Sequence, residues 1–321
     1  MCSVAKSNRS KGAFWATVLS NQQISGLYYR LILELEPSAT ETFGSVIPGQ
    51  FAMLDLTQTP LPPLETISAP LKDAARRQII LRRPFSFSDV SIRQGFDGQV
   101  VQLEIMYCVL GPSTVRMTSL AKGDKINLLG PLGNGFQLQP SKELAILIAG
   151  GMGSPPLIHL ASVLKSRFTG MKVMVFAGAK SRDNLPFTIR TDGRTGLILE
   201  EFQQLTVNDC YVATDDGSAG FKGYATSCLE EWLSRNPWKA EKTILYACGP
   251  EIMLAAAARL AQKHNMDCQV SMERIMACGI GVCQSCAIEH KTGVEGQTEY
   301  RLCCQDGPVF DAKDVVFGGE D

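Results

Sequence analysis

Short segments in which apolar and polar residues alternate fill the first 140 residues of the chain. Stretches such as "LYYRLILELE" and "GQFAMLDL" are rich in β-branched and aromatic residues, and Gly and Pro stand at the breaks between them. This pattern is typical of β-strands, and no helical period separates one segment from the next. Residues 1–140 are therefore predicted to form an antiparallel β-barrel or sandwich. The segment 57–78 is proline-rich and then mildly helical, and we expect it to be an insertion between two strands.

The hydrophobic pattern changes at Leu144. The run "LAILIAG" is apolar throughout, as in a strand that is buried on both faces. Helix-like and strand-like segments then alternate to about residue 265, which predicts a parallel sheet in a Rossmann-like domain over 141–265. Residues 266–321 have little helical period and many Cys and Gly, so we expect them to form a small third domain.

Composition narrows the class of protein. The 321 residues carry a formal net charge of −1, whereas nucleic-acid phosphates are bound by concentrated basic surfaces, so no nucleic-acid partner is expected. The longest apolar stretch of strand character, 144–153, is about half the length that spans a bilayer. The N-terminal residues lack the apolar core of a secretory signal. The protein is therefore expected to be cytoplasmic, away from membranes, with its eleven cysteines reduced.

Three cysteines near the C-terminus, Cys278, Cys283 and Cys286, have the spacing C-x4-C-x2-C, and a pair, Cys303 and Cys304, follows them. This is the spacing of plant-type [2Fe–2S] sites, in which four thiolates hold two irons. The first three cysteines are therefore predicted to be cluster ligands. The spacing does not decide which cysteine of the pair is the fourth.

Two glycines inside the first cysteine loop, Gly279 and Gly281, support this interpretation. They allow the backbone to wrap closely around a cluster and leave N–H groups free to point at its sulfides. Zinc is the main alternative, although the four-residue gap is less typical of structural zinc sites. Disulfides are a third interpretation, which the reducing compartment and the odd number of cysteines disfavour.

The turn "IAGGMGSPP" joins the apolar run at 144–150 to a helix-like segment. Its glycines permit a tight turn and the close approach of a dinucleotide pyrophosphate at the positive end of the helix; they are Gly150, Gly151 and Gly153. The fit to the usual fingerprint is partial, because Pro156 occupies the place of its third glycine. An ordinary strand–helix turn would also favour glycines.

A second turn of this kind, "YACGP", follows a later strand-like segment. Ligands bind at the carboxyl ends of parallel strands, so we expect this turn to contact the nicotinamide cofactor through Cys248, Gly249 and Pro250. The alternative for Cys248 is a plain buried thiol.

Together with "RRPFSFSDV" at 82–90, these pieces resemble the ferredoxin–NADP reductase superfamily. In that superfamily an R-x-[YF]-S stretch holds a flavin. The resemblance implies that Arg83 reaches the flavin pyrophosphate, that Phe85 packs on the cofactor and that Ser86 lies near the isoalloxazine, with Pro84 in the same stretch. A strand that enters a turn after proline is the simpler interpretation of these residues.

A narrower resemblance covers nearly the whole chain, from about Phe14 to Val316. The motifs "SMERIMACGIGVCQSC", "CQDGPVF", "LGPLGNGF" and "ATDDGSAGFKG" are similar to those of the electron-transfer subunits of class 1B dihydroorotate dehydrogenases. In that family the fourth cluster ligand directly precedes x-DGPVF. The resemblance therefore implies Cys304 as the fourth ligand.

The chain departs from the family pattern at the flavin. The family's I-Y-R strand corresponds here to Met106, Tyr107 and Cys108, and a cysteine in the last place makes no charged contact with phosphate. Where the family has G-x-G-T at the flavin pyrophosphate, this chain reads "GPST", so Ser113 and Thr114 are expected to donate hydrogen bonds there. The insertion at 57–78 is also longer than the family norm.

The family resemblance implies an architecture, three cofactors and a partner. The expected fold is an antiparallel β-barrel that binds FAD, then an α/β parallel-sheet domain that binds NAD, then a small [2Fe–2S] domain. The implied protein is the electron-transfer subunit of an NAD-dependent dihydroorotate dehydrogenase in pyrimidine biosynthesis. It would exchange electrons with an FMN-containing catalytic subunit in a heterotetramer of two of each. No residue is expected to act as a general acid or base.

Other functions stay open at this point. The electron-transfer subunits of sulfite reductases and hydrogenases share the same layout of cofactors. A redox-sensing module that binds nucleotide and zinc without turnover belongs to another class, and zinc in place of iron would identify it. NADP is an alternative to NAD, because Lys180 and Arg182 in "AKSRDN" suit a 2′-phosphate whereas Asp183 suits a ribose hydroxyl.

Overall fold

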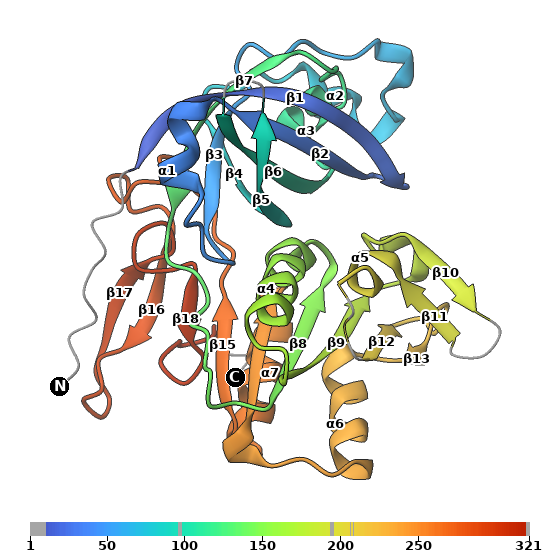
Figure 1. Ribbon diagram of the computed structural model, residues 1–321, viewed down its shortest axis with the longest axis vertical. Helices are drawn as coiled ribbons and strands as arrows, with labels where there is room; N and C mark the ends of the chain where they lie inside the picture. Colours follow the sequence, from blue (N-terminus) through green and yellow to red (C-terminus); the bar gives the residue numbers. More distant parts are fainter. Residues whose placement is uncertain (1–10, 96–97, 193–195, 206, 208, 319–321) are drawn as a thin grey trace.

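The computed structural model describes residues 11–95, 98–192, 196–205, 207 and 209–318. Two seven-stranded sheets dominate it, one above the other, with a hairpin and loops of the C-terminal segment beside the lower sheet (Figure 1). The architecture is the predicted one: an antiparallel sheet domain followed by a largely parallel one. None of the helices in these ranges is long and apolar enough to cross a membrane.

The upper sheet is antiparallel throughout and has the strand order β4-β3-β7-β1-β2-β6-β5. Alternate side chains of β2 point into a core that holds Leu31, Leu33 and Leu103 without exposed surface, as the apolar–polar alternation predicts. The strands are β1 (Gly12–Ser25), β2 (Tyr28–Leu35), β3 (Phe51–Asp55), β4 (Arg83–Ser86), β5 (Asp89–Gly95), β6 (Gly98–Cys108) and β7 (Lys125–Leu132). Two short helices, α1 (Thr40–Phe43) and α3 (Pro112–Met117), also belong to this domain.

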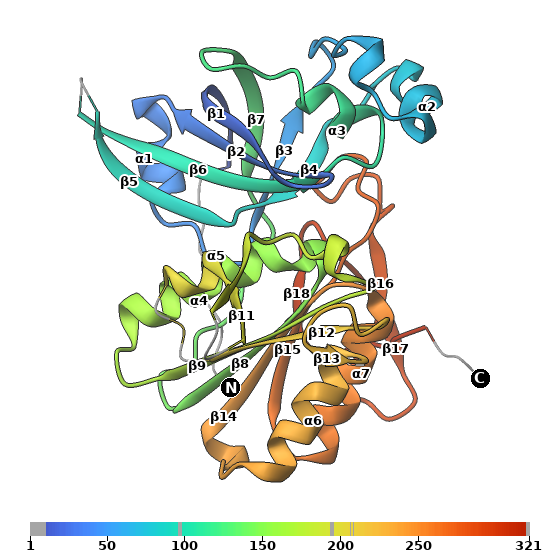
Figure 2. The ribbon, with the colours of Figure 1, turned by 90° about the vertical axis from the view of Figure 1, so that its right-hand side faces the viewer.

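The insertion lies between β3 and β4. It contains two 3₁₀ turns, Leu64–Thr66 and Ala69–Leu71, and the short helix α2 (Lys72–Arg76). Figure 2 shows α2 beside α3 on top of the barrel.

The lower sheet has the order β13-β12-β9-β8-β14-β15-β18 and is parallel except at β18. Successive residues of β8 face opposite sides: Ile146 packs with α6 and α7, whereas Leu147 packs with α4. Both faces of the strand are thus covered by helices, which explains its continuous apolar sequence. The elements are β8 (Leu144–Gly150), α4 (Ser154–Arg167), β9 (Lys172–Ala179), β12 (Asp209–Thr214), β13 (Phe221–Lys222), α6 (Ala225–Arg235), β14 (Thr243–Cys248) and α7 (Glu251–Lys263). A small pair, β10 (Ile189–Asp192) and β11 (Gly196–Leu199), and the helix α5 (Glu200–Gln203) complete this part.

The C-terminal segment shares the lower sheet. Strand β15 (Asp267–Ser271) pairs with β14, and β18 (Val309–Asp311) returns to pair with β15. The cysteine-rich residues lie between these two strands, with the hairpin β16 (Ala287–Lys291) and β17 (Thr298–Leu302). The third domain expected from residue 266 therefore contributes two strands to the sheet of the second.

Polar contacts hold the barrel on the lower domain. Nη2 of Arg30 in β2 lies 2.9 Å from Oε1 of Glu201 in α5, and the hydroxyl of Tyr28 donates to the backbone oxygen of Asn184 at 3.0 Å. Glu201 is buried and also accepts a hydrogen bond from the Thr188 N–H at 3.1 Å. Because a buried carboxylate is stable only with such partners, these contacts define how the two domains sit on each other.

Candidate functional site

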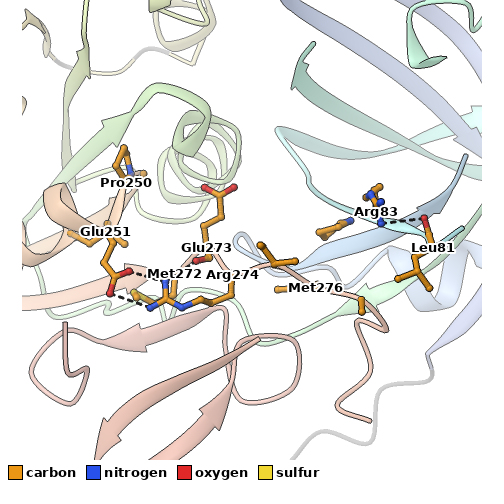
Figure 3. Close-up of a pocket in the computed structure, with 13 residues that line it drawn as sticks. Leu81, Arg83, Pro250, Glu251, Met272, Glu273, Arg274 and Met276 are labelled. Atoms are coloured by element: carbon orange, nitrogen blue, oxygen red, sulfur yellow. Dashed lines mark hydrogen bonds and ion pairs between the residues drawn. The ribbon is translucent and has the colours of Figure 1, made fainter. Parts of the chain in front are cut away.

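A cavity of about 740 Å³ lies where the three parts of the chain meet (Figure 3). The barrel contributes the start of β4, the lower sheet contributes the turn before α7, and the segment 272–277 leads from β15 to the first cysteine. Its lining residues include Arg83, Pro84, Gly249 and Pro250. The structure thus brings together the flavin motif, the nicotinamide motif and the entry to the cysteine loop, which are far apart in the sequence.

The two adjacent arginines of the flavin motif have different surroundings. Arg82 donates to the side chain of Asn127 at 2.7 Å and lies 3.5 Å from Asp55. Arg83 lines the cavity, and its Nη1 contacts only backbone oxygens, those of Leu81 and Arg82 at 3.4 and 3.3 Å. No carboxylate among the described residues pairs with Arg83. A cation without a counter-ion beside a cavity suits an anionic group such as a pyrophosphate.

The remaining residues of the motif lie along β4, which pairs with β3. Phe85 is half-buried and packs against the barrel core, and Ser86 is also half-buried. Pro84 lines the cavity beside Arg83.

The three predicted residues of β6 face in different directions. Tyr107 is buried inside the barrel, where its hydroxyl donates to Asn21 at 3.0 Å and its ring stacks on Tyr29. Burial raises the pKa of Tyr107. Met106 is buried against the lower domain, and Cys108 is half-buried beside the hydroxyl of Tyr28, with its pKa raised by burial. None of the three lines the cavity described above.

The "GPST" turn opens α3, and its two hydroxyls differ. Oγ1 of Thr114 accepts hydrogen bonds from the N–H groups of Leu110 and Gly111 at 2.9 and 3.1 Å, so it caps the helix itself. Oγ of Ser113 is buried and has no partner in the described part of the chain. A buried hydroxyl without a partner is costly unless a ligand satisfies it, so Ser113 fits a phosphate oxygen better than Thr114 does.

The two glycine turns of the lower domain pack against each other, because β8 and β14 are neighbouring strands. A Cβ at Gly153 would lie 2.1 Å from the carbonyl oxygen of Cys248, and one at Gly249 would lie 2.9 Å from Cα of Gly150. These three glycines are therefore required by packing. Gly151 differs: it has φ +49° and open space where its Cβ would be. That open space at the start of α4 leaves room for a pyrophosphate to approach.

Two acidic residues that the sequence motifs did not single out also line the cavity. The Glu273 carboxylate points into it, as Figure 3 shows, and has no hydrogen bond or ion pair with any described residue. Glu251, at the start of α7, is held by both guanidinium nitrogens of Arg274 at 2.9 and 3.1 Å, which lowers its pKa. The Cys248 thiol lies near Ser271 and Glu273, and burial raises its pKa to about 12, so it is neutral. In the sequence, Glu273 and Arg274 are the two charged residues of the motif "SMERIM", and this is the signal that could indicate them.

The predicted cluster cysteines gather at one loop. The N–H groups of Ile280 and Cys283 point at Sγ of Cys278 at 3.5 and 3.4 Å, and the N–H of Cys304 points at Sγ of Cys286 at 3.5 Å. All ten described cysteines are free of disulfides. Thiols surrounded by backbone N–H groups form a donor set that fits an iron–sulfur cluster.

The loop glycines have the conformation that this wrapping needs. Gly279 and Gly281 have φ +72° and +86°, and a Cβ at Gly281 would lie 2.2 Å from Oε1 of Gln305. No three His, Cys, Asp or Glu side chains in the described ranges are arranged to hold a single metal ion. A [2Fe–2S] cluster takes its four thiolates in pairs, one pair on each iron.

The two adjacent cysteines have different neighbours. Cys304 lies by Cys286, Cys278 and the N–H of Gly281, and burial first, then these sulfurs, raise its pKa to about 12. Cys303 is fully buried and also lies by Cys286, whose carbonyl oxygen accepts a hydrogen bond from the Cys303 N–H at 3.0 Å; its surroundings further include Arg274. What separates the pair is Cys278, which is a neighbour of Cys304.

Three apolar residues in and just before the cysteine loop are exposed. Ile275, Ile280 and Val282 are 87%, 49% and 75% exposed, and Cys283, which follows Val282 in the sequence, is also exposed. We call these three residues the loop-apex patch. Large exposed apolar side chains close together in the sequence favour a protein–protein contact.

Comparisons with known proteins agree with this arrangement. Residues 273–316 match the model of the iron–sulfur cluster binding domain of dihydroorotate dehydrogenase B. The dihydroorotate dehydrogenase B (NAD(+)), electron transfer subunit of Caldanaerobacter subterraneus subsp. tengcongensis is 32% identical over 302 residues, which cover 94% of this chain and 98% of that protein. The protein of the same name from Geobacillus kaustophilus is 36% identical over 248 residues, 77% of this chain and 84% of that one.

Solved structures share the fold. That of an NADH-dependent reduced ferredoxin-NADP oxidoreductase has a TM-score of 0.69 at 22% identity, covering 94% of this chain and 90% of that one. A ferredoxin NADP+ reductase from Neisseria gonorrhoeae has a TM-score of 0.53 at 14% identity, with 78% and 91% coverage.

Fold and site together define a chain with the fold of a ferredoxin-NADP oxidoreductase and an added iron–sulfur cluster binding domain. Within that class, the chain belongs to the family of dihydroorotate dehydrogenase B electron transfer subunits. The family resemblance inferred from the sequence motifs is thereby confirmed.

Proposed function

We propose that this protein is the electron transfer subunit of an NAD-dependent dihydroorotate dehydrogenase. It carries electrons between NAD(H) and a catalytic subunit that oxidises dihydroorotate, in pyrimidine biosynthesis. The observation that carries the proposal is the cavity at which β4, the turn before α7 and the approach to the cysteine loop meet. An electron carrier needs its redox groups close together, and this is the place where the three motifs come together.

The sites follow the three units, 1–140, 141–265 and 266–321. In the first, Arg83 and Ser113 bind the FAD pyrophosphate, with Pro84, Phe85 and Ser86 beside the flavin ring. In the second, the space at Gly151 and the turn at Cys248–Pro250 receive NAD. In the third, Cys278, Cys283, Cys286 and Cys304 hold the [2Fe–2S] cluster. The free guanidinium of Arg83 and the unpartnered hydroxyl of Ser113 support the flavin site.

When bound, flavin exchanges hydride with nicotinamide and single electrons with an iron–sulfur cluster. The residues of this chain supply position and charge. Arg83 and Ser113 neutralise and orient phosphate, and the backbone N–H groups around Cys278 stabilise negative charge on sulfur. Hydride transfer and single-electron transfer do not require a side chain of this chain to act as a general acid or base.

We further propose that the catalytic subunit docks on the loop-apex patch. The patch lies in the same segment as Cys283, the exposed cysteine of the predicted ligands, so docking there would shorten the path for electrons. The partner is proposed to carry FMN and to assemble with this subunit as two of each, in the cytoplasm. The ten described cysteines free of disulfides support a reducing compartment.

An anaerobic visible spectrum before and after NADH tests the function. Flavin and iron–sulfur bands should be present and should bleach together on addition of NADH. Iron and sulfide analysis separates this function from the zinc-binding module: zinc without iron and sulfide would support that module instead. The purified protein should then couple NAD+ reduction to dihydroorotate oxidation only in the presence of the catalytic subunit.

A further inference from the structure

The insertion at 57–78 is an integral part of the barrel. Three of its residues or immediate neighbours are almost fully buried, and they share one apolar cluster with three residues in and after α3. The two groups are Ile67, Ala75 and Ile79 on the insertion side, and Val115, Met117 and Leu120 on the α3 side. The insertion thus contributes side chains to the same core as α3, and α2 lies beside α3 (Figure 2).

Two hydrogen-bonded contacts reinforce this packing. Nη1 of Arg116, in the last turn of α3, donates to the carbonyl oxygen of Ala75 in α2 at 3.0 Å and to that of Pro112 at 3.3 Å. Oγ of Ser119 lies 2.9 Å from the carbonyl oxygen of Pro60, at the beginning of the insertion, and 2.8 Å from that of Arg116. The insertion is therefore attached to α3 and the residues after it from two separate points.

Helix α3 needs outside support. It has only six residues, and helices this short are not stable alone. Its first position is Pro112, which has no N–H to offer, and the Thr114 hydroxyl is used in capping. The unpartnered Ser113 hydroxyl is what α3 presents to an anion, so its placement depends on how rigidly α3 is held.

We propose that the insertion is the support that fixes α3, so that retention of FAD depends on residues remote from the flavin itself. In this chain the insertion offsets the loss of the basic residue at Cys108 and of the second glycine in "GPST". The proposal rests on the function proposed above, because it assumes that Ser113 faces the flavin pyrophosphate.

The test is to titrate flavin-free protein with FAD and to measure rebinding through the quenching of flavin fluorescence. Arg116→Ala should raise the FAD dissociation constant about tenfold, or ~1.4 kcal/mol, and Ser119→Ala should raise it by a smaller factor. Arg116→Lys, which keeps a cationic donor, should recover part of the affinity. Without flavin, amide hydrogens of α3 should exchange faster in both alanine variants, while iron content and the thermal midpoint stay near wild type.

Arg77→Ala is the matched control. Arg77 forms an ion pair with Asp73 at 2.8 Å and no other ion pair within the described ranges, and both side chains are largely exposed, so FAD affinity should not change. Unchanged affinity in both Arg116→Ala and Ser119→Ala would overturn the proposal. Weaker binding in Arg116→Ala with normal exchange and a normal Ser119→Ala variant would also overturn it, since Arg116 would then touch the flavin directly. Wild-type protein that binds no FAD would instead refute the proposed function.

Discussion

Arg274 and Glu251 join the cysteine segment to the nucleotide-binding domain. The guanidinium of Arg274, four residues before Cys278, meets both carboxylate oxygens of Glu251, the first residue of α7, at 2.9 and 3.1 Å. The backbone N–H of Gly318 lies 3.4 Å from the same carboxylate. One carboxylate beside the cavity, that of Glu251 at the start of α7, thus binds both the approach to the cysteine loop and the backbone at Gly318.

Removing the Glu251 charge should weaken this tie in a pH-dependent way. The hydrogen bond from Arg274 is the main cause that lowers the pKa of Glu251 below its ordinary value of 4.5. A depressed pKa in the folded state contributes stability above the ordinary value, and that stability is lost as pH falls through the depressed value. We expect Glu251→Gln to lower the free energy of unfolding at pH 7 by about 1 kcal/mol. Denaturant titrations at pH 7 and in acid should show the difference shrinking; a constant difference would refute this assignment. Glu295→Gln, at an exposed position between β16 and β17, is the control.

Substitution of the two adjacent cysteines should have different effects on the iron content of the protein. Cys304→Ser should lose the cluster, because Cys304 is the one that lies beside Cys278, Cys286 and Gly281. Cys303→Ser should keep it, with at most a modest loss of stability from changing a buried thiol. Iron and sulfide content with the visible spectrum will measure this. Full iron content in Cys304→Ser would show that the fourth ligand is another residue.

Loss of the free cation at the cavity should release flavin. Arg83→Ala removes a guanidinium that has only backbone contacts within the described ranges, and charge-assisted bonds to phosphate contribute about 1.5–3 kcal/mol. We expect the dissociation constant for flavin to rise at least about tenfold, and the flavin content of the purified protein to fall accordingly. Arg82→Ala is the matched control: its partners are Asn127 and Asp55, so it should lose stability and keep flavin. Equal flavin content in Arg83→Ala and wild type would place the flavin site elsewhere.

The Glu273 carboxylate should distinguish oxidised from reduced nicotinamide. It points into the cavity without a partner among the described residues, and only the oxidised ring is positively charged. Because Glu273 is exposed, the expected effect is modest, about threefold. Glu273→Gln should raise the inhibition constant of NAD+ in NADH-linked dye reduction by that factor while the KM for NADH changes less. Glu295→Gln, on the exposed turn of the β16–β17 hairpin, should alter neither constant. Parallel changes in both constants would contradict the electrostatic interpretation.

The packing of the two glycine turns predicts a stability effect. Gly153→Ala would bring a Cβ to 2.1 Å from the Cys248 carbonyl oxygen, a rigid backbone atom, and overpacking of this kind costs about 1–3 kcal/mol. Gly170→Ala is the control, since nothing lies within 4 Å of its Cβ position. Urea unfolding should separate the two variants, and equal midpoints would show that the turns relax without cost.

Much of the fold could be predicted from the sequence, because burial leaves a pattern in each strand. The residues of β2 alternate because one face of that strand is buried, and the residues of β8 are apolar throughout because both of its faces are buried. Strand β18 could not be found in this way: it has three residues, Val309–Asp311, too few to show a period. Its place beside β15 depends on a contact between residues about 40 positions apart, which a local pattern does not record.

The site was predictable to the level of motifs and less so to the level of side chains. Arg83 and Pro84 line the cavity with Gly249 and Pro250, but the motif that contains Tyr107 does not reveal that its ring turns into the barrel. Ser113 and Thr114 are chemically alike in sequence, and only the capping geometry shows that one hydroxyl is already used. Glu273 stands in a quoted motif, yet nothing local shows that its carboxylate lacks a partner.

The pairing of β15 with β18 has a consequence for the cysteine-rich segment between them. The two ends of the cysteine-rich segment are held one strand spacing apart, about 4.8 Å, by hydrogen bonds of a sheet that contains no cysteine ligand. The hydrogen bonds between β15 and β18 therefore offset the entropic cost of bringing the ends of that loop together. The pairing of β15 with β18 thus keeps the two ends of the cysteine-rich segment together without any contribution from its thiols.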